Sequence, residues 1–221
     1  RFPYQMTLGA MQGNEALIEK MGLQIGEQCR RMGVHINYAP VVDVNNNPLN
    51  PVINFRSFGE NREDVTAKAL AYMKGLQKAG IITSAKHFPG HGDTGVDSHL
   101  DIPVLNHSRS RLDSLELYPY RELISNGLQG VMVAHLNLPA LDTTKSLAST
   151  LSKPIVTGLL RDELKFQGLV FTDAMDMKGA TKMFPEGTAN VKAILAGNDI
   201  LETFVDVPAA FEAIKKPQEH P

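Results

Sequence analysis

The stretch KHFPGHGDTGVDSH, residues 86–99, places three histidines and two aspartates within fourteen positions. One proline and three glycines separate them, so the stretch after its first residues can form neither a regular helix nor a regular strand. Imidazoles titrate near neutral pH, and both imidazoles and carboxylates bind metal ions. The spacing therefore leaves two chemistries open, a metal site and an acid–base pair.

A metal site would draw on five competent ligands: His87, His91, Asp93, Asp97 and His99. His87 and His91 are four residues apart, but Pro89 and Gly90 exclude the helical geometry that brings two such imidazoles to one ion. We therefore expect no metal and no other cofactor. A metal-dependent hydrolase built on His87, His91 and Asp93 is kept as the alternative.

An acid–base pair is the second chemistry, carried by Asp97 and His99. The carboxylate can accept a hydrogen bond from one ring nitrogen while the other nitrogen faces a substrate. The spacing is common by chance, so these residues could equally serve a polar loop.

Further candidate groups are Asp173, Arg56 and the Lys86–His87 pair that begins the stretch above. Asp173 ends the apolar run LVFTD, where a carboxylate could act as a nucleophile or base, or simply cap the following helix. Arg56 offers a rigid fork of donors for hydroxyls or carboxylates, or an ion pair with Glu60. Lys86 and His87 end another apolar run, and a charged pair there needs partners.

Short apolar runs alternate with amphipathic helical patterns along the chain. We expect strands at 34–44, 81–87, 131–135, 169–173 and 199–204. Helices are expected at about 14–32, from Asn61 to Gly80, from Ser108 to Gly127, from Ser152 to Gly168, around 191–195 and at 208–214. This alternation predicts an α/β fold with a parallel sheet covered by helices.

Each expected strand has a polar residue at or near its carboxyl end: Asp43, Lys86 with His87, His135, Asp173 and Glu202. In parallel α/β folds these ends meet at one edge, where active sites gather. We therefore expect the five groups to converge. Five strands are fewer than the eight of a closed barrel, so the sheet is either open or incomplete.

The composition excludes several partners. The formal net charge is −2 and the basic residues are scattered, which is not typical of a nucleic-acid-binding protein. No run of eighteen apolar residues predicts a membrane span. Cys29 is the one cysteine, so no intramolecular disulfide can form, and the compartment stays open.

Four motifs together carry a resemblance to a known family: KHFPGHGDTGVDSH, RSFG, VMVAH and VFTDAMDMKG. With them the chain resembles the family 3 glycoside hydrolases, in particular the bacterial β-N-acetylglucosaminidases that trim peptidoglycan fragments. The resemblance spans nearly the whole chain. It implies a TIM-type (β/α) barrel, an N-acetylglucosamine-terminated carbohydrate substrate and a two-step retaining mechanism.

The resemblance also implies roles for single residues. Asp173 matches the nucleophile that forms a covalent glycosyl–enzyme. His99 matches the general acid and base, and Asp97 matches the residue that orients it, in place of the usual second carboxylate. The positions that hold the sugar hydroxyls are matched by Lys86, His87, Arg56 and, as part of an Arg-Phe pair, Arg1.

Family members carry two barrel strands ahead of the first residue of this chain and one after its last. We therefore expect residues 1–221 to be a single barrel domain, partial at both ends, of a longer protein with room for a further domain. A phosphorylase, a β-glucosidase and a non-catalytic sugar-binding fragment also stay open as functions. The bacterial cytoplasm and the cell envelope both stay open as compartments.

Overall fold

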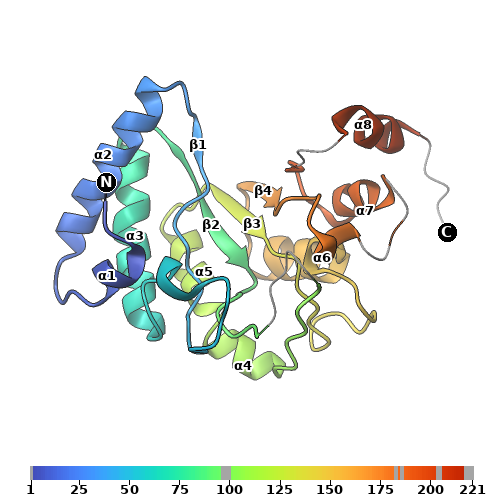
Figure 1. Ribbon diagram of the computed structural model, residues 1–221, viewed down its shortest axis with the longest axis horizontal. Coiled ribbons are helices and arrows are strands. Elements are labelled where there is room, and N and C mark those ends of the chain that lie inside the picture. Colours follow the sequence, from blue (N-terminus) through green and yellow to red (C-terminus); the bar gives the residue numbers. More distant parts are fainter. Residues whose placement is uncertain (1, 96–100, 182–183, 185–186, 203–205, 217–221) are drawn as a thin grey trace.

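A parallel β-sheet covered by helices forms the centre of the molecule (Figure 1). The computed structural model describes residues 2–95, 101–181, 184, 187–202 and 206–216. Four strands follow one another in sheet order and in chain order: β1 (Ile36–Asn37), β2 (Ile82–Phe88), β3 (Gly130–Val133) and β4 (Leu169–Thr172). All three pairings are parallel, as the apolar runs predict. The result is an open part of a TIM-type barrel.

The ends of this sheet are less regular than the sequence predicts. The run 34–44 forms only the two-residue β1 and a bridge from Val41 to Lys86, because Pro40 has no N–H to donate to a ladder. Only residues 199–202 of the strand expected at 199–204 are described, and they form less than a full strand. There, Ile200 forms an isolated parallel bridge with Phe171 beside β4.

The helices surround the strands in chain order. They are α1 (Gln5–Gly9), α2 (Glu15–Arg31), α3 (Arg62–Lys78), α4 (Arg109–Ser114), α5 (Tyr118–Ser125), α6 (Lys178–Thr181), α7 (Thr188–Ala196) and α8 (Val207–Lys215). A 3-10 turn covers Asn54–Arg56, another covers Ser149–Leu151, and Pro154–Glu163 forms a π-helix. None of the described helices combines the length and apolar character needed to cross a membrane.

Two helix starts follow the sequence prediction. The Asn61 side chain accepts a hydrogen bond from Asp64 N, and the Ser108 side chain accepts one from Arg111 N. The single helix expected from Ser108 to Gly127 is wrong, because the segment divides into α4 and α5. Pro119, in the first turn of α5, disfavours a continuous helix through the preceding residues.

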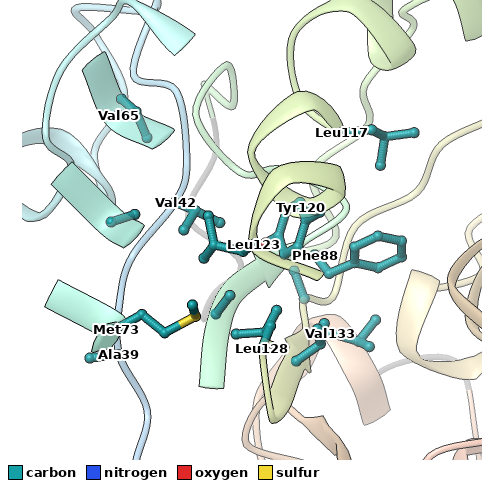
Figure 2. Close-up of a cluster of buried hydrophobic side chains, with 14 of the residues drawn as sticks. Ala39, Val42, Val65, Met73, Phe88, Leu117, Tyr120, Leu123, Leu128 and Val133 are labelled. Atoms are coloured by element: carbon teal, nitrogen blue, oxygen red, sulfur yellow. The ribbon is translucent and has the colours of Figure 1, made fainter. Parts of the chain in front are cut away.

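A buried apolar cluster joins α3, α5 and the two central strands (Figure 2). Met73 of α3 and Tyr120 and Leu123 of α5 belong to this cluster, and the two helices lie side by side against β2. The Phe88 and Tyr120 rings meet edge to face, with 5.0 Å between their centroids. Phe88 and Val133 are the last residues of β2 and β3, so this packing reaches the edge of the sheet that carries the polar groups.

Helices α2 and α3 lie side by side at the β1 end of the sheet (Figure 1). Their close approach depends on glycine: a methyl group at Gly75 would lie 2.1 Å from the carbonyl oxygen of Glu19 and 2.7 Å from the backbone nitrogen of Leu23. Backbone atoms cannot rotate aside as a side chain can. The α2–α3 contact is therefore intolerant of a larger residue at this position.

We expect Gly75→Ala to lower the free energy of unfolding by about 2 kcal/mol, because overpacking at a backbone contact outweighs the helix propensity of alanine. Gly158→Ala is the matched control, since a methyl group there meets only the Lys153 carbonyl at 4.0 Å. Urea unfolding followed by circular dichroism measures both variants. Equal stability of the two variants would contradict the proposed contact.

Candidate active site

The Asp43 carboxylate organises the carboxyl end of β2. It follows the Val41 bridge and is 1% exposed. Its Oδ1 accepts hydrogen bonds from His87 N (3.1 Å) and His91 N (2.7 Å), and its Oδ2 lies 2.7 Å from His87 Nδ1. Burial raises the pKa of Asp43, but the neighbouring His87 and His91 outweigh it and hold that pKa below its ordinary value. One carboxylate thus orients a ring and two backbone positions.

Arg56 approaches the same imidazole from the 3-10 turn Asn54–Arg56. One guanidinium nitrogen lies 3.3 Å from His87 Nε2, and another donates to the carbonyl oxygen of Val52 (3.4 Å). The guanidinium therefore faces His87. Arg56 and His87, predicted to act together, do lie together.

Lys86 lies near the carboxyl end of β2 and is partly buried. Burial and the nearby Arg56 lower the pKa of its ammonium group, while Asp173, Asp43 and Glu202 act in the opposite direction. Lys86 therefore sits among one cation and three carboxyl groups. Its need for partners, expected from the sequence, is met by these groups.

Asp173 comes directly after β4. Its backbone N–H donates to the Val133 carbonyl (2.9 Å), and its Oδ1 accepts from Ala174 N (2.9 Å). Burial raises the pKa of the carboxyl, but His87, His135, the Ala174 N–H and Lys86 together hold it below the ordinary value. The next helix, α6, starts only at Lys178, so Asp173 does not cap it. It is an ionised carboxylate beside basic groups.

Glu202 lies near Asp173. Its backbone N–H donates to Thr172 Oγ1 (2.9 Å), and its carbonyl accepts from Met175 N (2.7 Å). Burial and the charge of Asp173 raise the pKa of Glu202, while Lys86 lowers it. The predicted convergence of polar groups at one edge is therefore confirmed for Asp43, Lys86, His87, Asp173 and Glu202.

The loop after β2 is held by a separate set of hydrogen bonds. Asn50 Nδ2 donates to the carbonyl oxygens of His91 (2.8 Å) and Gly92 (3.0 Å). His91 Nδ1 lies 2.7 Å from Thr94 Oγ1. Burial and the neighbouring His87 lower the pKa of His91 to about 4, so the ring is neutral near pH 7.

These partners do not favour the metal alternative. His87 is bound to Asp43, His91 to Thr94, and Asp93 lies 2.9 Å from His107 Nε2. Within the part of the chain that the structure describes, no three His, Cys, Asp or Glu side chains are grouped so that they could hold a metal ion.

Three predicted site residues, Arg1, Asp97 and His99, lie outside the described residues. Their roles stay predictions.

The orienting role of Asp43 was not predicted from the sequence. A signal existed, since a carboxylate between Val42 and Val44 in an apolar run must find partners when it is buried. The sequence could not say that those partners lie 44 and 48 residues further along the chain.

A cavity of about 300 Å³ adjoins these groups. Arg56 and Lys86 line it together with Tyr38, Tyr72 and Gln5, whereas Asp173 is not part of its lining. Its volume is at the lower end of the range for small-molecule sites, ~300–1,000 Å³. Its wall combines the donors of Arg56, Lys86 and Gln5 with aromatic and aliphatic side chains.

A parallel sheet with carboxylates and basic groups at the carboxyl ends of its strands has the arrangement of the active sites in TIM-type barrels and open α/β folds. Residues 1–216 match the glycosyl hydrolase family 3 N terminal domain. The chain therefore belongs to glycoside hydrolase family 3.

Individual relatives agree with this assignment. Beta-hexosaminidase A of Pseudoalteromonas piscicida is 42% identical over 211 residues, which cover 90% of this chain and 35% of that protein. A family 3 beta-N-acetylglucosaminidase structure from Paenibacillus sp. str. FPU-7 superimposes with a TM-score of 0.91 at 43% identity, covering 95% of this chain and 40% of that one. The beta-glucoside phosphorylase BglX gives 0.92 at 31% identity, covering 96% and 40%.

The chain spans between about a third and about half of the length of the curated relatives it matches.

We expect Asp43→Asn to lower the free energy of unfolding at pH 7 by about 2 kcal/mol, because an amide cannot accept all three hydrogen bonds of the carboxylate. The folded-state pKa of Asp43 is lowered, so its contribution is present above the unfolded-state pKa of about 4 and is lost as the pH falls through the folded-state pKa. Urea unfolding between pH 7 and pH 3 should therefore show a steeper loss of stability for the unmodified chain than for Asp43→Asn.

Asp162→Asn, at an exposed carboxylate of the π-helix, is the matched control and should follow the unmodified chain. If the free energy of unfolding falls equally steeply with pH in the unmodified chain and in Asp43→Asn, this carboxylate does not have the assigned role.

Proposed function

We propose that this protein is a retaining exo-β-N-acetylglucosaminidase that removes terminal N-acetylglucosamine from peptidoglycan-derived or related glycosides without a metal. The observation that carries the proposal is Asp173, an ionised carboxylate just beyond a barrel strand and surrounded by basic groups. The β-hexosaminidase and β-N-acetylglucosaminidase names of the relatives support the substrate class.

The reaction has two steps. A carboxylate oxygen of Asp173 attacks the anomeric carbon, and the bond from that carbon to the leaving oxygen breaks as His99 gives this oxygen a proton. Water then attacks the same carbon, loses a proton to His99 and releases Asp173. Asp97 orients the imidazole and stabilises its protonated form.

The sugar is bound by the hydrogen-bond donors that lie around Asp43. Arg56 and Lys86 line the cavity with their donors, and His87 is held in place beside them. Arg1 belongs to the same subsite by its match to the family. Because Asp43 fixes the His87 ring and backbone, it acts as a positioning residue for this subsite.

A phosphorylase of the same family is the second candidate, favoured by the likeness to the BglX structure. Phosphate would then replace water in the second step, and a histidine acid–base tolerates this anion better than a carboxylate would. The reaction product in phosphate buffer, compared with that in an inert buffer of equal ionic strength, separates the two functions. A phosphorylase forms a glycosyl phosphate, whereas a hydrolase releases free N-acetylglucosamine in both buffers.

Asp173→Ala is expected to abolish turnover of an aryl β-N-acetylglucosaminide, with a loss of at least about a thousandfold, because the nucleophile is removed. Asp176→Ala, an exposed carboxylate three residues on, is the matched control and should retain turnover. Incubation with a 5-fluoro N-acetylglucosaminyl donor and peptide mapping should place the covalent label on Asp173. A label on another residue, or binding of the sugar without any turnover, would overturn the proposal.

His99→Ala should slow substrates with poor leaving groups far more than aryl glycosides with good ones, since good leaving groups need little protonation. The ratio of the two turnover rates measures this selectivity. An equal loss for both substrate types would exclude His99 as the general acid.

A further inference from the structure

His135 is a buried titratable group that the proposed reaction does not use. It lies just beyond β3 and is 0% exposed. Its Nδ1 lies 2.8 Å from Thr150 Oγ1, and its Nε2 lies 3.0 Å from the carbonyl oxygen of Ala174. That carbonyl belongs to the residue directly after Asp173. The imidazole therefore reaches the backbone that carries the proposed nucleophile.

The partners of the two ring nitrogens decide how many protons the ring carries. A carbonyl oxygen only accepts hydrogen bonds, so Nε2 must hold a proton that it donates to Ala174. The Thr150 hydroxyl has one proton and lies 2.6 Å from the carbonyl oxygen of Ala134. Two oxygens at that distance need a proton between them, and only Thr150 can supply it.

The Thr150 hydroxyl therefore has no proton to donate to His135, and its oxygen can only accept a hydrogen bond from the ring. Nδ1 of His135 must then hold a proton as well. The neighbouring bonds are consistent with this count. Ser149 Oγ donates to the second lone pair of the Ala134 carbonyl (2.6 Å) and accepts from Leu136 N (3.2 Å). Both hydroxyl protons are therefore committed to the Ala134 carbonyl rather than to the imidazole.

We infer that His135 is a doubly protonated imidazolium and that it is a positioning residue for Asp173. Its Nε2–H fixes the Ala174 carbonyl, and its positive charge lies near the Asp173 carboxylate. A buried cation is costly unless an opposite charge accompanies it, and Asp173 provides that charge. The inference rests on the proposed function only where it treats Asp173 as the nucleophile.

Among the described residues, the other titratable groups that act on Asp173 come from two places in the chain. Lys86 and His87 approach from β2, and Glu202 lies beside Asp173 after the Ile200 bridge. Burial raises the pKa of Asp173, but His87, His135 and Lys86 more than offset it.

His91 provides an internal contrast, because it also pairs with a threonine. The Thr94 hydroxyl lies 2.7 Å from His91 Nδ1 but 3.1 Å from the carbonyl oxygen of His91, so its proton can point to the ring. Burial lowers the pKa of His91 to about 4. One fold thus holds a histidine that accepts from threonine and one that donates to it.

Nitrogen-15 NMR of the full chain with labelled histidine tests the protonation directly. We expect both ring nitrogens of His135 to show N–H shifts from pH 6 to pH 8, whereas His91 shows one nitrogen without a proton. His135→Gln identifies the signals, and Thr150→Ser, which keeps the hydroxyl, identifies them by a shift if the first variant does not fold. An unprotonated ring nitrogen at His135 at pH 7 would overturn the inference.

A second measurement tests the effect on Asp173 without using turnover. Glutamine at 135 keeps an amide donor for Ala174 but removes the charge, so carbon-13 NMR of labelled aspartate should show the pKa of Asp173 rising by about one unit in His135→Gln. Asp173→Asn identifies the signal, and Thr150→Ser should leave the pKa unchanged. An unchanged pKa of Asp173 in His135→Gln would contradict the inference. If the pKa rises as expected but the unmodified chain does not hydrolyse the glycoside, only the proposed function is contradicted.

Discussion

One buried carboxylate sets the geometry on which the candidate site depends. Asp43 receives hydrogen bonds from a ring and from two backbone positions on either side of Pro89. Removing a carboxylate from water is costly, and these bonds offset that cost only if all three donors are in place. The carboxylate therefore fixes the end of β2 and the loop that follows it relative to each other. It also orients the His87 ring that the Arg56 guanidinium contacts.

The sheet supplies the second constraint. Parallel strands all end at the same edge, so a polar residue at the end of each one joins a common cluster. Asp173 and Lys86 come from strands that are not neighbours, yet they interact electrostatically across β3. His135, at the end of the strand between them, lies deeper than either and is fully buried. The edge thus has two layers, an upper one of partly exposed groups and a lower one that is buried beneath it.

The sequence predicted the parts of this structure that depend on local chemistry. Strand β2, helices α2 and α3, and the caps at Asn61 and Ser108 follow from apolar periodicity and side-chain hydrogen bonding within three residues. The division between α4 and α5 was missed because the apolar spacing continues across it, although Pro119 was a visible signal.

Groups whose function depends on distant partners could not be predicted in this way. His135 was expected at the sheet edge, but its contacts with Thr150 and Ala174 join segments 15 and 39 residues away. Nothing local to the histidine distinguishes it from His91. Residue type and spacing therefore located the candidate groups, while burial and partner chemistry decided how each one is charged.

The order of the strands has a consequence for how the molecule is assembled. Each strand pairs with the one that precedes it in the chain, through a single connecting segment. Pairing consecutive strands costs less loop-closure entropy than pairing strands that are further apart in the chain, because each loop is shorter. Every βα unit finds its neighbour already synthesised, so the sheet can grow from its amino-terminal side while the ribosome is still translating the rest.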